Sequence, residues 1–113
     1  MKTIVAGTRT ITEMRFLEEA LAACGWIPTE VVCGMARGVD TLGETWAKAN
    51  SIPIKCFPAN WSLLGKRAGF ARNAQMAEYA DALILVWDGQ SRGSANMLEL
   101  AKRKGMRIYE KIV

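Results

Sequence analysis

Short apolar runs alternate along the chain with segments in which apolar residues recur every three or four positions. The apolar runs are typical of buried strands and lie at residues 3–6, 30–33, 53–57, 82–87 and 107–112. The periodic segments predict four helices, the first capped by Thr12 and ended by Gly25, the others over residues 40–49, 67–79 and 94–105. This alternation predicts a parallel sheet with helices on both faces.

The order of elements restricts how such a sheet can be wound. Right-handed crossovers and short connections favour the strand order 3-2-1-4-5, a Rossmann-like α/β three-layer sandwich formed by one domain over residues 1–113. Ligands of such sheets bind beyond the carboxyl ends of the strands, where the order reverses. We therefore expect a cleft between the loops after Ala6 and Trp87, with the loop after Cys33 as a side wall.

The amino-acid composition limits which metal sites, cofactors and catalytic bases are expected. The chain has 113 residues, half of them hydrophobic, which suits one domain with a buried core. It contains no histidine, and Cys24, Cys33 and Cys56 have no metal-ligand spacing, so we expect no metal site, no histidine base and no cofactor. Three widely spaced cysteines in apolar surroundings are typical of reduced core residues in a cytoplasmic protein, without a disulfide.

Charge and hydropathy bear on the partners. Residues 1–7 read as a buried strand rather than a signal peptide, and no apolar stretch is long enough to cross a bilayer, so no membrane partner is expected. The net charge of +4 suits an anionic partner but is modest for a protein dedicated to duplex DNA.

Two loops share a small pattern, Gly-Met-Ala-Arg-Gly at 34–38 and Gly-Gln-Ser-Arg-Gly at 89–93, and each leads from a strand into a helix. Glycine lets a ligand approach the backbone, the helix N-terminus offers unpaired N–H groups, and arginine adds a forked cation. We expect Arg9, Arg37 and Arg92 to converge in one cleft that binds phosphate. The residues predicted to form it are Gly7, Thr8, Arg9, Gly34, Arg37, Gly38, Gly89, Ser91, Arg92, Gly93 and Ser94.

An alternative is that the glycines merely turn the chain from strand to helix. Neither loop reads G-x-G-x-x-G, no acidic residue ends the second strand, and G-x-x-x-x-G-K-[ST] is absent. These absences disfavour an ordinary NAD enzyme and a P-loop ATPase.

Residues 57–73 are unusually polar for a connection and are expected to lie over the cleft. Trp61 there is suited to stacking on a base, and Arg72 and Asn73 to contacting phosphate or sugar. The alternative is that Trp61 packs into the core while Arg72 pairs with a carboxylate. The sequence leaves both interpretations open.

Asp40 and Asp88 are the acidic residues closest to the predicted cleft. Asp40 is expected to cap the chain or to pair with Arg37, and Asp88 is suited to binding a ribose hydroxyl. They are the candidates for a catalytic carboxylate, but neither forms the paired arrangement that acid–base catalysis needs.

Several motifs occur in a recognisable order: Gly-Met-Ala-Arg-Gly-Val-Asp at 34–40, Trp46-Ala47, Phe-Pro-Ala-Asn-Trp at 57–61, Gly65-Lys66, Ala68-Gly69, Arg72-Asn73 and Gly93-Ser94. In these the chain resembles the small stand-alone SLOG domains of the YspA-like family (DUF2493) of bacteria and their phages. The resemblance implies a Rossmann-like fold and a nucleotide-derived ligand, and by analogy a homodimer. The wider superfamily includes lysine-decarboxylase-like phosphoribohydrolases, the DNA-processing protein A family and sensors of signalling nucleotides.

The chain departs from the motifs of this superfamily at two positions. The phosphoribohydrolases carry P-G-G-x-G-T-x-x-E, and their glutamate falls here on Met97, while Glu99 lies roughly 200° further around the helix. The usual aspartate of the F-P-A-D-W string is Asn60. The chain is thus predicted to bind, rather than hydrolyse, a nucleotide-derived signal. The alternatives are a hydrolase of an N-glycosidic or phosphate bond, using Asp40 or Asp88, and a single-stranded nucleic-acid binder.

Overall fold

Strands and helices alternate along the chain, as the pattern predicts. The structure, a computed structural model, describes all 113 residues. Its elements are β1 (Lys2–Gly7), α1 (Met14–Ala23), β2 (Glu30–Cys33), α2 (Val39–Ala49), β3 (Ile54–Cys56), α3 (Trp61–Leu64), a 3-10 turn (Gly65–Arg67), α4 (Ala68–Tyr79), β4 (Ala82–Trp87), α5 (Arg92–Arg103) and β5 (Arg107–Ile112).

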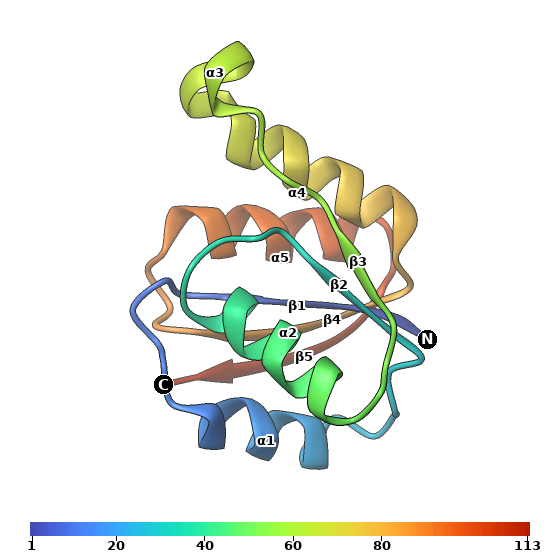
Figure 1. Cartoon of the computed structure of the whole chain (residues 1–113). Coiled ribbons are helices and arrows are strands. Elements are labelled where there is room, and N and C mark those ends of the chain that lie inside the picture. Colours follow the sequence, from blue (N-terminus) through green and yellow to red (C-terminus); the bar gives the residue numbers. More distant parts are fainter.

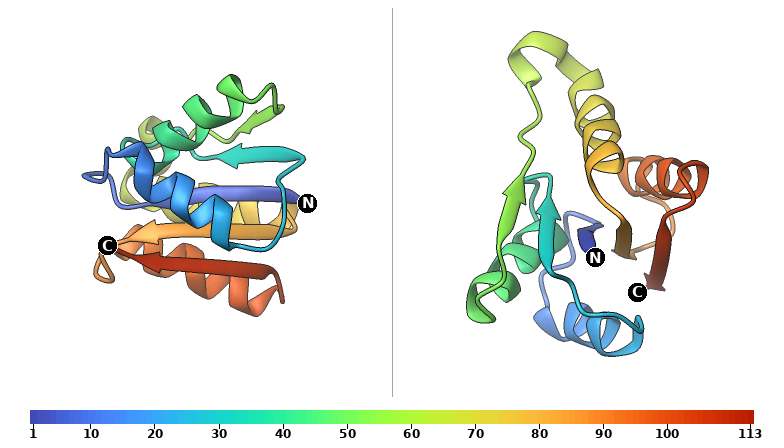
Figure 2. Two further views of the ribbon diagram at one scale, coloured as in Figure 1. Left: turned by 90° about the horizontal axis from the view of Figure 1, so that it is seen from below. Right: turned by 90° about the vertical axis from the view of Figure 1, so that its right-hand side faces the viewer.

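The five strands form one sheet in the order β3-β2-β1-β4-β5. All four neighbouring pairs are parallel, and the strands run side by side in Figure 2. The α/β fold and the strand order predicted from the sequence are confirmed. β1 and β4 are neighbours, so their carboxyl ends meet where the order reverses.

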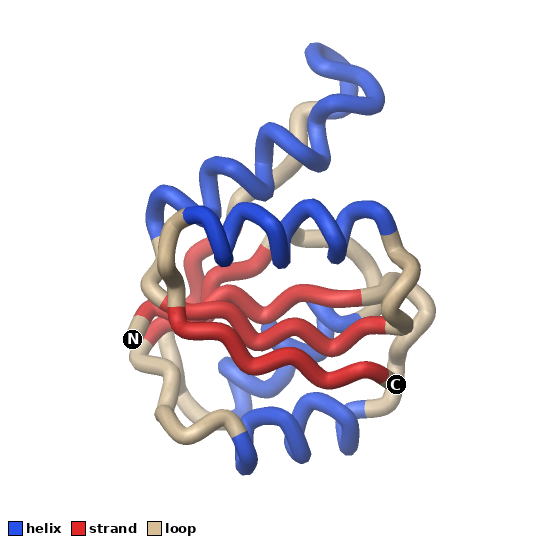
Figure 3. The backbone as a smooth tube through the Cα atoms, turned by 180° about the vertical axis from the view of Figure 1, so that it is seen from behind, coloured by secondary structure: helices blue, strands red, loops and turns tan.

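Helices cover both faces of the sheet. In Figure 1, α4 and α5 lie on one side of the strands and α1 and α2 on the other, and Figure 3 shows the same layers from behind. Side chains of a strand alternate between the faces. Ile4 and Leu83 therefore pack beneath α4 and α5, while Val5 and Ile84 pack against α1 and α2. All four side chains are fully buried.

The helix ends differ most from the prediction at α1 and α5. α1 begins at Met14 after Glu13, so Thr12 is not its cap. α5 begins at Arg92, two residues before the expected start, because the side chain of Ser91 accepts the Ser94 N–H and caps the helix.

None of the helices has both the length and the apolar character needed to span a membrane.

The segment between β3 and α4 is more ordered than its polar sequence indicates. It forms α3, in which Asn60 Oδ1 accepts the Leu63 N–H at 3.1 Å, and then a 3-10 turn that leads into α4. In Figure 1, α3 and the start of α4 rise away from the sheet. Trp61, Leu63 and Phe70 are consequently among the exposed large hydrophobic residues.

The cysteines lie where strands and a helix end. Cys24 follows α1, while Cys33 and Cys56 are the last residues of β2 and β3. Cys24 and Cys33 are buried, but Cys56 is exposed, so its assignment to the core is wrong. β3 is a short edge strand, and its end is not covered as the end of an inner strand would be.

Candidate ligand-binding cleft

Two adjoining cavities open at the carboxyl ends of the strands. The α5 cavity measures about 290 Å³ and the Trp61 cavity about 350 Å³. Arg9, Ala36 and Arg72 line both. The other residues of the α5 cavity are Ala6, Gly7, Thr8, Thr10, Asp40, Asn73, Met76, Ser91, Gly93, Ser94 and Met97. The other residues of the Trp61 cavity are Gly34, Met35, Arg37, Pro58, Ala59 and Trp61.

The α5 cavity meets the first turn of its helix at a buried serine. Ser94 is 4 % exposed, and its hydroxyl has no hydrogen-bond partner. A buried polar group without a partner costs free energy that a ligand can recover. The N-terminal end of α5 also carries partial positive charge from its unpaired N–H groups. The turn is therefore suited to an anion.

Gly93 leaves the backbone of that turn accessible. A Cβ added to it would meet nothing within 4 Å. Asn73, buried on α4, holds the turn by donating to the Gly93 carbonyl at 3.2 Å and to Asn96 Oδ1 at 3.0 Å. The accessible backbone is thus fixed in position before any ligand binds.

Arg72 forms the wall between the two cavities. Its Nε donates to Asn73 Oδ1 at 3.0 Å and its Nη1 to the Gly34 carbonyl, and it makes no ion pair. Burial lowers the pKa of its guanidinium, the charge of Asp40 acts in the opposite direction, and the nearby Arg9 lowers the pKa further. Arg72 therefore carries a buried positive charge next to a second cation.

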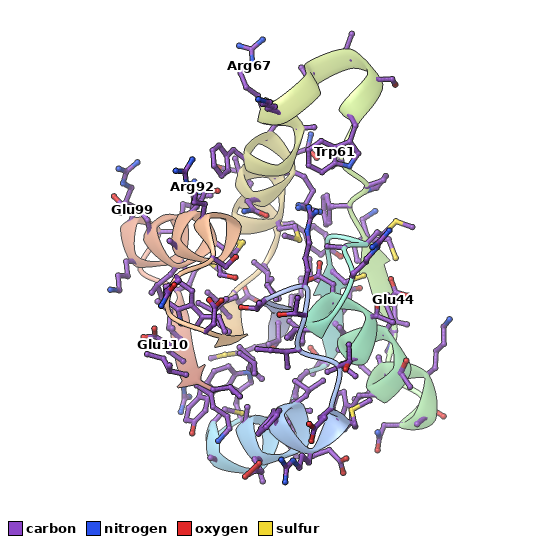
Figure 4. All side chains as sticks on the ribbon, turned by 90° about the vertical axis from the view of Figure 1, so that its left-hand side faces the viewer. Glu44, Trp61, Arg67, Arg92, Glu99 and Glu110 are labelled. Atoms are coloured by element: carbon purple, nitrogen blue, oxygen red, sulfur yellow. The ribbon has the colours of Figure 1, made fainter.

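The Arg9 guanidinium lies over the Trp61 ring, and both side chains line the Trp61 cavity. The Arg9 guanidinium carbon lies 5.9 Å from the Trp61 ring centroid, and Arg9 makes no ion pair. Trp61 is 50 % exposed and belongs to neither hydrophobic core. Figure 4 shows it turned inward, between α4 and the segment that follows β3. Of the two interpretations left open above, core packing does not describe Trp61, and Arg72 bonds a carbonyl and an amide rather than a carboxylate.

Asp40 braces the loop after β2. Its Oδ2 accepts the N–H groups of Gly34 at 3.0 Å and Ala36 at 3.4 Å. Burial raises the pKa of this carboxyl, and the charge of Arg72 and the two N–H bonds act the other way. Arg37 makes no ion pair with it, so Asp40 caps backbone groups while also lining the α5 cavity.

Asp88 shapes the loop before α5 from outside the cleft. Its Oδ1 accepts the N–H groups of Gln90 and Ser91, both at 2.9 Å, and these bonds hold the pKa of its carboxyl below the ordinary value. The Asp88 N–H donates to the buried Thr8 hydroxyl at 3.0 Å, which ties the loops after β1 and β4 together. Asp88 lines neither cavity.

The glycines on the β1 and β2 side of the cleft are packing residues. A Cβ on Gly38, whose φ is +72°, would lie 2.4 Å from the Thr8 carbonyl oxygen and 2.5 Å from that of Arg9. A Cβ on Gly34 would overlap the Arg72 guanidinium, and one on Gly7 the Val86 carbonyl. These glycines let two loops and a buried arginine pack closely, in a way that a side chain at these positions would prevent.

The structure brings together most, but not all, of the residues predicted from the sequence. Gly38, Gly89, Asp88 and Arg92 line neither cavity, and Figure 4 shows Arg92 projecting outward from the start of α5. The expected convergence of three arginines is thus wrong for Arg92. Its helix begins earlier than predicted, and the buried Arg72 stands in the cleft with Arg9 and Arg37.

Eight residues that line the cavities lie outside the predicted set: Ala6, Thr10, Met35, Ala36, Pro58, Ala59, Met76 and Met97. Met76 and Met97 stand at the helical spacing that is typical of core residues. Both methionines are indeed 1 % exposed and belong to the core beneath α4 and α5, and they also form the apolar floor of the α5 cavity. Helical spacing alone cannot separate these two roles.

Comparison with known proteins identifies relatives of this chain. A sequence profile described as the YspA, cpYpsA-related SLOG family (YAcAr) matches residues 1–63. The gene 61 protein of Mycobacterium phage D29 is 30 % identical over an alignment that covers 69 % of this chain and 67 % of the phage protein.

A solved structure, DNA processing protein A (DprA) from Streptococcus pneumoniae, has a similar fold. It matches with a TM-score of 0.77 and 18 % sequence identity, over 96 % of this chain and 49 % of the other. The present chain therefore spans about half the length of that protein, and the likeness concerns the fold.

Proposed function

The chain belongs to the YspA, cpYpsA-related SLOG family, and from this premise we propose that it binds a phosphorylated nucleotide-derived ligand. The phosphate occupies the α5 cavity and the nucleoside the Trp61 cavity. The chain acts as a binding module that senses or sequesters the ligand. The observation that carries the proposal is the buried, unpartnered hydroxyl of Ser94 at the N-terminal turn of α5.

The charges around the α5 cavity support a phosphate. Arg9 and Arg72 raise the positive potential, and the only carboxylate that lines the cavity, Asp40, already accepts two backbone N–H groups. A phosphate between the arginines would offset their mutual repulsion and accept from the Ser94 hydroxyl and from N–H groups of the helix turn. The cavity therefore favours a dianion over a neutral ligand.

The Trp61 cavity supports a nucleoside next to that phosphate. Its walls combine the half-exposed Trp61 ring with Pro58, Ala59 and the side chain of Arg37. Aromatic and guanidinium faces stack on bases. Small-molecule sites occupy roughly 300–1,000 Å³, and the two cavities together fall in that range, at about 290 and 350 Å³.

Isothermal titration calorimetry with a panel of nucleoside mono- and diphosphates, cyclic nucleotides and ADP-ribose tests the proposal. Ser94→Ala should weaken binding of the best ligand by about ten- to a hundredfold, since it removes a hydrogen bond to a charged group. It should not lower the free energy of unfolding and should raise it slightly, because it removes a buried hydroxyl that has no partner in the free protein.

Ser62→Ala on α3 is the matched control, because Ser62 lines neither cavity. It should bind as the wild type does. No binding by any panel member would contradict the proposed function, and so would an unchanged affinity in Ser94→Ala.

One observation favours a second candidate, hydrolysis of the bound nucleotide. Asp40 lines the α5 cavity, and burial raises the pKa of its carboxyl toward the range useful for proton transfer. Its two N–H bonds fit a structural cap better. Chromatography of the same panel after incubation separates the two, because turnover lost in Asp40→Asn would establish the enzyme.

The third candidate, single-stranded nucleic acid, rests on the likeness to DNA processing protein A and on the net charge of +4. It predicts affinity that increases with oligonucleotide length and falls steeply with added salt. A protein that binds a mononucleotide should show no increase in affinity with oligonucleotide length. Titrating oligonucleotides of increasing length therefore separates the two.

A further inference from the structure

Three side chains with metal-ligating atoms lie together outside the residues that line the cleft. They are Cys33 at the end of β2, Cys56 at the end of β3 and Glu44 on α2. The two sulfur atoms are 3.5 Å apart. Glu44 Oε1 lies 3.2 Å from the Cys33 sulfur and 4.0 Å from the Cys56 sulfur.

Strand register and one close helix contact assemble this cluster. β2 and β3 are parallel, and Cys33 pairs directly with Cys56, so the two side chains project from the same face of the sheet. α2 covers that face, and a Cβ on its Gly43 would lie 2.9 Å from Val5. The helix therefore sits close to the sheet, which brings the next residue, Glu44, onto the two thiols.

We propose that Cys33, Cys56 and Glu44 bind a zinc ion. Tetrahedral zinc with bonds of about 2.3 Å to sulfur and about 2.0 Å to oxygen holds its ligand atoms about 3.8 Å (sulfur to sulfur) and about 3.5 Å (sulfur to oxygen) apart. The observed separations of 3.5, 3.2 and 4.0 Å match these edges to within about half an ångström. Two thiolates and a carboxylate are a ligand set that selects zinc over magnesium or calcium.

The cluster is open to an entering ion on one side. Cys33 is buried and Glu44 partly buried, but Cys56 is exposed, and Figure 4 shows Glu44 on the side of α2 that borders β3. Water supplies the fourth ligand from that open side, as in other three-residue zinc sites. The two thiol protons, now directed at Glu44 Oε1, pass to solvent as two zinc–sulfur bonds form.

Zinc would fix one wall of the cleft. Cys33 directly precedes Gly34, whose N–H donates to Asp40 and whose carbonyl accepts from Arg72. An ion that joins β2, β3 and α2 anchors the start of that loop. The inference does not depend on the proposed function, because it concerns different side chains and a different ligand.

Competition with a chromophoric chelator tests the proposal on protein kept reduced with a phosphine. The wild type should bind one Zn²⁺ per chain, and Co²⁺ should give the intense absorption of thiolate-to-cobalt charge transfer. Cys56→Ser should lower the affinity at least about a hundredfold, and Glu44→Gln about tenfold. Zinc should raise the thermal midpoint of the wild type but not of Cys56→Ser.

Cys24→Ser is the matched control, because Cys24 is also a buried thiol but lies outside the cluster, and it should bind zinc as the wild type does. Cys56 is exposed, so its substitution should not disturb folding, which circular dichroism checks. Three results would overturn the proposal: no stoichiometric zinc, undiminished affinity in Cys56→Ser, or a cobalt spectrum without charge transfer. A Cys33–Cys56 disulfide that persists under phosphine and excludes zinc would overturn it too.

Discussion

The two glycine–arginine loops have the same pattern in the sequence but different environments in the fold. In residues 34–38 the glycines pack against a buried arginine and against backbone carbonyls, and Asp40 holds the N–H groups. In residues 89–93 the last glycine faces open space, next to a hydroxyl without a partner. The first loop packs against its neighbours and forms a wall of the cleft. The second leaves the backbone at Gly93 and the Ser94 hydroxyl available to a ligand. A shared motif therefore does not establish a shared role.

The largest effect that separates the loops should be on stability. Gly38→Ala requires a positive φ and brings Cβ into two carbonyl oxygens, so it should destabilise the fold by about 2–4 kcal/mol. Gly93→Ala adds a methyl group in open space within a helix and should be neutral, or stabilising by up to about 1 kcal/mol. Urea denaturation measures both. Equal losses would show that the two glycines have the same role.

Substitution of Arg9 and of Arg92 should change the affinity for the nucleotide by different amounts. Arg9→Ala removes a cation that lines both cavities and should weaken nucleotide binding by about ten- to a hundredfold. Arg92→Ala removes the same charge from the start of α5, outside both cavities, and should weaken it less than about threefold. Calorimetry at two salt concentrations measures the pair. A greater loss for Arg92→Ala would return that residue to the site.

The smallest difference should appear in the pH dependence of stability. Burial raises the pKa of Asp40 above 3.8, so the folded chain holds a proton that the unfolded chain releases, and stability falls as pH rises from 3.8 through the raised pKa. The N–H bonds of Asp88 lower its pKa below 3.8, so stability falls as pH drops from 3.8 toward the lowered pKa. Asp40→Asn should remove the loss of stability above pH 3.8, and Asp88→Asn should remove the loss of stability below pH 3.8. Urea denaturation across pH would refute the assignment if both variants changed the same slope.

The fold was predictable because each of the five strands and the four longer helices has a local sequence signal, which the short α3 lacks. The run Ala82–Trp87 is apolar throughout, is buried on both faces, and has the predicted bounds. Strand order followed from connection length and handedness. The position of the cleft then followed from the meeting of β1 and β4.

The details of the site depend on three-dimensional facts that a linear pattern does not contain. Arg92 and Arg72 are both arginines near glycines, but only Arg72 points into the cleft, because helix phase decides which way each projects. Cys33 and Cys56 are 23 residues apart and lack any metal-ligand spacing, yet strand register places their sulfurs 3.5 Å apart. Ser94 is the one buried serine, and its hydroxyl has no partner, which depends on packing rather than on the local sequence.

Nucleotide binding to Gly93→Val tests the central claim most directly, because a Cβ at this position would meet nothing within 4 Å and the branched side chain would occupy space over the α5 turn. Calorimetry with the best ligand of the panel should detect no binding, while urea denaturation shows a fold about as stable as the wild type, within about 1 kcal/mol. If folded Gly93→Val binds that ligand as tightly as the wild type, the phosphate does not lie at the α5 turn, and the central claim is contradicted.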